Sequence, residues 1–354
     1  MFRTVTLTVL LLGFQLVQAQ PNDNWTEVNL AVVDRQIIPA YLAFAEKAQP
    51  LASRGASFCR SPSAEALTAW QLSFHVSMDA WQGIQHVQFG PITYFNWNYR
   101  LQFWPDEKGT GERQLEALIA EHDAEQLSAD NFARLSVGVQ GFPALERLLF
   151  ADDALTLLQQ DPFRCQVAQT IAANIGEIAA GVHERWAGEF RTTVANADDR
   201  AVFENAQAAT IDILKALVEA LPRIRDQKVL AALGASYAQA RVRRAESWRS
   251  ARSLRNIKFN LAALETFFSG PDSATIALST VLHSEDVAPI EAGFATLMDT
   301  LDSLPDAMAV ALASEEQYAR LQSLASQLTE LDDLLETALK NTDLYLGFNS
   351  LDGD

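Results

Sequence analysis

The chain has 354 residues, a formal net charge of −18 and two cysteines. A surface with this excess of carboxylates repels nucleic acid and anionic membranes, so a nucleic-acid-binding function is excluded. The length is enough for two domains or one large one.

The first residues have the pattern of a secretory signal peptide. Arg3 supplies a positive start, an apolar run extends from Val5 to Val17, and Ala19 ends a small-residue cleavage site. The apolar run is too short to span a bilayer, and no later segment is long and apolar enough. We therefore expect residues 1–19 to be removed, leaving an exported protein without a transmembrane segment. It is periplasmic if the host is a Gram-negative bacterium.

The remaining chain predicts an all-α fold with two helical-bundle domains. Alanine and leucine are abundant, glycine and proline are sparse, and no long run of alternating β-branched residues occurs. Asn196–Asp199 is the expected boundary, so residues 20–196 form an N-terminal bundle and residues 197–354 a C-terminal bundle. Among the expected helices are 25–51, kinked at Pro39, then 61–89, 162–191, 235–268, 273–282, 286–301 and 314–340.

The two cysteines, Cys59 and Cys165, are expected to form one disulfide. An even pair in an exported protein is most simply a single bridge. The alternative, a redox pair, lacks the usual Cys-x-x-Cys spacing.

One helix face carries polar groups where lysine and glutamate are usual. His75, Asp79, Gln82 and His86 follow one another at helical spacing, while Trp70 and similar apolar residues lie opposite. Imidazole and carboxylate are ligands of first-row transition metals, so the stripe predicts a polar cavity or metal site. The alternative is a polar face that is paired with neighbouring helices.

Glu146 lies on a helix turn that is otherwise apolar. If the segment is helical, Phe142, Leu149 and Phe150 share its side. A carboxylate buried among such groups must be paired, ligated or protonated. Glu146 is therefore a candidate site residue, and a structural ion pair with an arginine is the alternative.

An arginine-rich stretch, residues 241–258, stands out in this acidic chain. As one helix, it would place Arg249, Arg252, Asn256 and Asn260 on a common face. Arginine forms bidentate pairs with carboxylates and keeps its charge when buried. We expect this face to meet Glu146, Asp79 or the C-terminal acids, or to bind a small anionic ligand; ordinary exposed ion pairs are the alternative.

The ordered motifs resemble the imelysin-like family. They are the segment from Trp81 to Pro91, residues 141–150 (Gly-Phe-Pro-Ala-Leu-Glu-Arg-Leu-Leu-Phe), residues 248–255 (Trp-Arg-Ser-Ala-Arg-Ser-Leu-Arg), and the final residues 346–354. The resemblance covers essentially the whole mature chain. It implies an exported or envelope-attached bacterial protein with two helical bundles, linked to iron uptake. The resemblance also suggests metallopeptidase activity as an alternative, because the founding member was described as an insulin-cleaving metallopeptidase.

The sequence departs from the family at one motif position. The family pattern Gly-x-His-x-x-Glu is proposed to bind metal, and here Gly141 and Glu146 match but Pro143 replaces the histidine. Proline has no ligand atom, which argues against peptidase activity. A rebuilt metal site would use Glu146, His75, Asp79 and His86, with iron or another divalent metal as the ion.

The leading hypothesis is therefore a non-catalytic binding or accessory protein in iron uptake, with an envelope protein as a possible partner. Its pocket would lie near the domain interface. The alternatives are a metallopeptidase of the imelysin type and a structural interaction module of the envelope. The residues expected to line the pocket are Gly141, Glu146, His75, Asp79, Gln82, His86, Arg249, Arg252 and Asn256.

Overall fold

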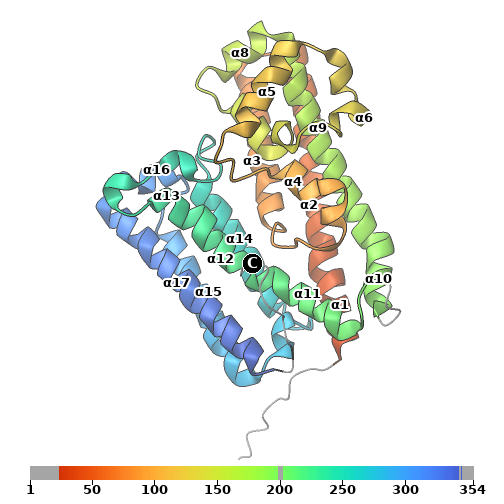
Figure 1. The fold of residues 1–354 in the computed structure, drawn as a ribbon, viewed down its shortest axis with the longest axis vertical. Coiled ribbons are helices and arrows are strands. Elements are labelled where there is room, and N and C mark those ends of the chain that lie inside the picture. Colours follow the sequence, from red (N-terminus) through yellow and green to blue (C-terminus); the bar gives the residue numbers. More distant parts are fainter. Residues whose placement is uncertain (1–23, 198–201, 343, 345–354) are drawn as a thin grey trace, which may run out of the picture.

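The structure is a computed structural model that describes residues 24–197, 202–342 and 344, and this part of the chain is helical without strands (Figure 1). The all-α prediction is confirmed. Among these residues no helix is long and apolar enough to cross a membrane. The expected signal peptide and the C-terminal segment 346–354 lie outside the described residues.

Long helices from the first half of the chain lie along one side of the molecule. Helix α2 (Ile38–Arg60) packs against both α3 (Ala64–Gln82) and α9 (Pro162–Arg185). The expected kink at Pro39 is a change of helix: α1 (Trp25–Val32) and a π-helical turn (Val33–Ile37) precede α2, whose first turn contains the proline. The remaining elements of this half are α4 (Trp97–Leu101), α5 (Thr110–Glu121), α6 (Ala129–Phe132), α7 (Gly141–Leu149), α8 (Ala154–Gln160) and α10 (Arg191–Ala195).

The second half of the chain lies on the other side in Figure 1. Helix α14 (Ser253–Ser269) packs against α15 (Ser284–Asp302), which packs against α17 (Glu315–Lys340). Helix α14 also packs against α3, and this contact joins the two halves at a seam. The domain boundary itself stays a prediction. The other elements are α11 (Ala206–Val218), α12 (Ala220–Arg223), a π-helical segment (Ile224–Leu230), α13 (Ala231–Leu233) and α16 (Met308–Ala311).

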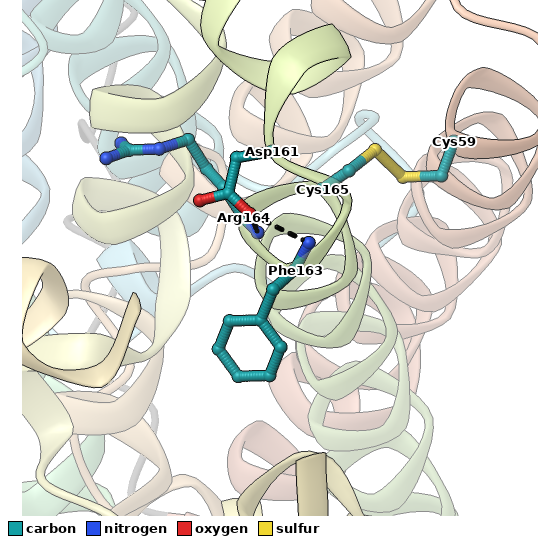
Figure 2. Close-up of a disulfide and its surroundings, with 5 residues drawn as sticks. All are labelled: Cys59, Asp161, Phe163, Arg164 and Cys165. Atoms are coloured by element: carbon teal, nitrogen blue, oxygen red, sulfur yellow. Dashed lines mark hydrogen bonds between the residues drawn. A yellow bond between two sulfur atoms is a disulfide. The ribbon is translucent and has the colours of Figure 1, made fainter. Parts of the chain in front are cut away.

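The expected disulfide between Cys59 and Cys165 is present (Figure 2). It joins the last turn of α2 to the first turn of α9, with 5.8 Å between the two Cα atoms. Asp161 caps α9 beside the bridge by accepting hydrogen bonds from the backbone N–H groups of Phe163 and Arg164. The bridge therefore fixes the start of α9 against the end of α2.

The helix expected over 235–268 is wrong in its first half, because α14 begins only at Ser253. The preceding residues form a loop with short 3-10 turns, in which Gly234, Ser247 and Ala251 have positive φ angles. Left-handed residues interrupt a helix. Two further helix predictions are wrong in extent: residues 273–282 contain only the 3-10 turn Leu278–Val281, and α3 ends at Gln82 rather than Phe89.

Candidate functional site

Gly141 opens α7 in a conformation that requires glycine. Its φ is +72°, and an added Cβ would lie 2.3 Å from the carbonyl oxygens of both Arg100 and Leu101. Gly141 was expected to line the pocket, but it serves a different purpose. It lets the start of α7 pack directly on the backbone of α4, which positions Glu146 one turn further along.

Glu146 is buried, and its carboxylate contacts Ser250 of the arginine-rich segment. One carboxylate oxygen, Oε1, accepts hydrogen bonds from the backbone N–H of Ser250 at 2.8 Å and from the Ser250 hydroxyl at 2.7 Å. No arginine nitrogen lies within ion-pair distance of Glu146 among the described residues. Burial raises the pKa of the Glu146 carboxyl above its usual value, and the Ser250 hydrogen bonds and the charges of Arg249 and Arg147 only partly oppose this.

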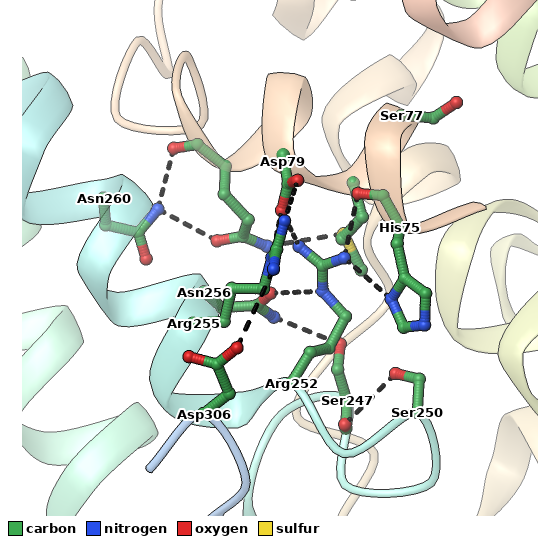
Figure 3. Close-up of polar contacts among 12 residues, drawn as sticks. His75, Ser77, Asp79, Ser247, Ser250, Arg252, Arg255, Asn256, Asn260 and Asp306 are labelled. Atoms are coloured by element: carbon green, nitrogen blue, oxygen red, sulfur yellow. Dashed lines mark hydrogen bonds and ion pairs between the residues drawn. The ribbon is translucent and has the colours of Figure 1, made fainter. Parts of the chain in front are cut away.

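Asp79 is held between two arginines at the seam (Figure 3). Its Oδ1 accepts from Arg252 at 2.6 Å and from Arg255 at 2.9 Å, and its Oδ2 accepts from Arg255 at 2.6 Å. The Arg252 side chain is only 1% exposed. A guanidinium buried this deeply requires a charged partner, so Asp79 is structurally committed to the two arginines.

His75 is joined to the same arginine one turn earlier on α3. Nη1 of Arg252 donates to the His75 carbonyl at 2.9 Å and lies 3.1 Å from its Nδ1 (Figure 3). Arginine only donates, so Nδ1 is the acceptor and the proton is on Nε2. Burial, reinforced by Arg252 and Arg255, lowers the pKa of His75 to about 4, which keeps the ring neutral near pH 7.

The polar contacts continue from Arg252 into a second buried ion pair. Nε of Arg252 donates to Asn256, which donates to Glu246 at 2.7 Å. Glu246 lies 3.0 Å from the ammonium of Lys228, which also donates to Gln82 and Asn260. Both charged side chains of this pair are at most 5% exposed. We call the connected side chains the seam network: His75, Asp79, Gln82, Gln102, Lys228, Glu246, Arg252, Arg255, Asn256 and Asn260.

Two predicted site residues lie apart from this network. Arg249 belongs to the loop rather than to a helix face shared with Arg252; it stacks on Trp248 at 4.4 Å and lies 3.9 Å from the exposed Glu112. His86 lies beyond the end of α3, with its ring centroid 4.6 Å from that of Phe267, and neither ring nitrogen has a hydrogen-bond partner among the described residues. Burial lowers the pKa of His86 to about 3.

A cavity of about 450 Å³ opens between the halves beside Lys228 and Glu246. Side chains from α3 and α4 line one wall, and residues of the π-helical segment and α14 line the other. This volume is in the range of small-molecule sites. The lining includes Trp81, Gln85, His86, Tyr99, Gln102, Arg223, Gln227 and Asn260.

Comparison with known proteins identifies the family. The Imelysin (Peptidase M75) family model matches residues 37–335, which is most of the chain. The chain belongs to the imelysin family. No curated protein matches it.

Two solved structures share the imelysin fold seen here. An imelysin-like protein from Psychrobacter arcticum 273-4 superposes with a TM-score of 0.77 at 21% identity, covering 94% of this chain and all of its own. A putative iron-regulated protein A precursor from Parabacteroides distasonis ATCC 8503 has a TM-score of 0.74 at 15% identity, covering 90% of this chain and 96% of its own.

The imelysin motif position does not fit a metal in this chain. Pro143 offers no donor atom, and Glu146 is occupied by Ser250. The residues predicted to rebuild the site, Glu146, His75, Asp79 and His86, are not gathered into one donor set. Throughout the described ranges, no group of three or more His, Cys, Asp or Glu side chains is placed to hold a metal ion.

Sequence reasoning named six of the ten residues of the seam network and missed its second ion pair, Lys228 and Glu246. Neither Lys228 nor Glu246 was among the residues predicted for the site, although Glu246 lies in the arginine-rich stretch 241–258. A single lysine followed directly by the apolar run Val229–Leu233 was the available signal for Lys228. Gln102 comes directly after the end of α4, and Glu246 lies in the loop before α14. Neither is in a regular helix, so no periodicity in the sequence indicated where their side chains lie.

Proposed function

We propose that this protein is an exported, non-catalytic binding protein that acts in iron acquisition and binds its ligand at the seam between the two halves. The observation that carries the proposal is the cavity of about 450 Å³ beside the buried Lys228–Glu246 pair. The family membership and the printed name of one structural neighbour, an iron-regulated protein A precursor, support the link to iron.

The state of the seam residues supports binding rather than catalysis. Glu146 is occupied by Ser250, Asp79 by two arginines and Glu246 by Lys228. A metallopeptidase needs a metal-activated water and a general base that is free to take its proton. Glu146, His75, Asp79 and His86, which are not gathered into one set of ligands, supply neither. The guanidinium of Arg252 is paired with Asp79 and is therefore not available to an anionic ligand.

The iron role is tested by deleting the gene in the source organism and measuring the uptake of radioactive iron during iron limitation. We expect uptake to fall and to return when the full-length gene is restored. A gene that lacks codons 2–19 should not restore uptake, because the proposal requires export. Unchanged uptake in the deletion strain would refute the role in iron acquisition.

Three further experiments test the metallopeptidase hypothesis, direct metal binding and the hypothesis of a structural envelope module. Incubation with unfolded insulin should give no cleavage, whereas cleavage that EDTA abolishes would establish the metallopeptidase. Calorimetric titration with ferrous, ferric and zinc ions measures direct metal binding, and loss of the heat in Glu146→Ala would locate the ion at the motif. Co-purification of an envelope protein without any ligand would favour the structural module.

A further inference from the structure

Several buried polar atoms, which have no partner within the part of the chain that the structure describes, belong to residues that line the seam cavity. They are both ring nitrogens of His86, Nε1 of Trp81 and Oε1 of Gln102. All three residues are at least nine-tenths buried. Native proteins pair most such atoms with protein, water or ligand. A molecule bound in the seam cavity would supply partners for these four atoms.

The lining of the cavity restricts the chemistry of that molecule. Both cations of the lining have a carboxylate partner: Lys228 lies 3.0 Å from Glu246, and Arg223 lies 3.8 Å from Glu219, so the wall has little net charge. Aromatic rings from Tyr99, Phe103 and Trp104 supply flat apolar surface, and Tyr99 at the rim is 58% exposed. Flat apolar surface with a few polar groups selects an organic ligand over a bare ion.

We propose that the seam cavity binds an uncharged, ring-shaped organic molecule that carries adjacent hydroxyl groups. Its face stacks on the aromatic lining, and its hydroxyls pair with His86, Trp81 and Gln102. A hydroxyl both donates and accepts, which matches the Trp81 donor, the Gln102 acceptor and the one donor and one acceptor of a neutral imidazole. This inference rests on the proposed function, which places ligand binding in the same cavity, and it adds the class of the ligand.

The proposal requires side-chain rotamer changes that turn these buried atoms toward the ligand, and such changes are common on binding. Because burial keeps the His86 ring neutral, it offers one donor and one acceptor across the physiological pH range. A bare metal ion is the poorer match, since the only carboxylate among the lining residues, Glu246, is paired with Lys228.

The test is calorimetric titration of the purified mature chain with two probes, catechol and methyl β-D-glucoside. Both carry adjacent hydroxyls on a ring; one is a planar aromatic and the other a sugar, so the two arms distinguish the sources of this chemistry. We expect saturable binding of at least one probe, accompanied by a change in tryptophan fluorescence from Trp81 and Trp104.

The decisive variant is His86→Phe, which keeps the contact with Phe267 but removes both ring nitrogens. We expect it to bind the probe roughly tenfold more weakly, which is the effect of one lost hydrogen bond on affinity, and to melt no earlier than wild type. The matched control is His122→Phe, because His122 is 58% exposed at the end of α5 and does not line the cavity. It should bind the probe as wild type does.

Absence of saturable binding by either probe, or equal binding by wild type and His86→Phe, would overturn the inference and leave ordered water as the partner of these atoms. This result is separate from the iron-uptake measurement. A deletion strain that loses uptake together with a cavity that binds neither probe would keep the iron role and reject the ligand class.

Discussion

Ser250 places two hydrogen bonds on a single oxygen of Glu146, one from its backbone N–H and one from its hydroxyl. The motif glutamate of α7 is thereby tied to the loop that precedes α14. Because the backbone N–H contributes one of the two bonds, the loop conformation matters to Glu146 as well as the identity of residue 250.

The raised pKa of Glu146 predicts a pH dependence of stability. The folded protein holds a proton on this carboxyl at pH values where the unfolded chain, with an ordinary pKa of 4.5, has released it. This contribution is fully present below pH 4.5 and is lost as pH rises toward the folded pKa, by about 1.4 kcal/mol per unit. Glu146→Gln removes this titration, so the variant should gain stability relative to wild type as pH rises through that window.

Urea unfolding of wild type and Glu146→Gln at several pH values checks this expectation. Glu189→Gln is the control, since that side chain is 80% exposed and should run parallel to wild type. A constant difference between wild type and Glu146→Gln at every pH would contradict the raised pKa.

Asp79→Asn should be among the most damaging single changes at the seam. It removes the negative charge that compensates the buried Arg252, and breaking a buried ion pair costs about 3–5 kcal/mol. Asp306→Asn removes the other carboxylate near Arg255, but it is 62% exposed and should cost less than about 1 kcal/mol. Similar unfolding free energies for the two variants would show that Arg252 does not depend on Asp79.

Two glycine-to-alanine changes should have opposite signs. In Gly141→Ala the new Cβ meets the carbonyl oxygens of Arg100 and Leu101 at a φ of +72°, so we expect a loss of at least about 2 kcal/mol. Gly188→Ala meets nothing within 4 Å in a helical segment and should be neutral or stabilising by up to about 1 kcal/mol. Thermal and urea unfolding would reveal a failure of either expectation.

Removal of the disulfide should weaken the protein strongly. The bridge closes a sequence separation of 106 residues, and the chain-entropy model gives about 4.7 kcal/mol for a loop of this order. The double variant Cys59→Ala, Cys165→Ala should therefore unfold at a much lower urea concentration than wild type. A midpoint equal to that of the oxidised protein would show that the bridge adds little.

The sequence was informative where helices are regular. His75, Asp79 and Gln82 were predicted to share a face, and all three contact the second half of the chain, because α3 keeps its period over that span. Arg252 was expected to meet Asp79 and does so, whereas Asn256 contacts Arg252 and Glu246 instead. These contacts depend on helical spacing, which residue order encodes directly.

Prediction failed where the backbone leaves the helix. Ser247 and Ala251 adopt left-handed conformations that are unusual for these residues, and nothing in their side chains signals this. Arg249 was therefore assigned to the wrong face, and Glu246 was missed. His86 was assigned to the stripe because the end of α3 at Gln82 was not recognised.

The seam network also has a consequence for the order in which the protein is completed. Asp79 precedes Arg252 by 173 residues, so if the first half of the chain folds first, this carboxylate is still in water. The charges of the two halves are matched only once the later segment has docked. Cutting the chain between residues 196 and 197 would leave Asp79 in one piece and Arg252 in the other, each without its counter-charge. Neither piece should therefore reach the stability that it has in the intact chain.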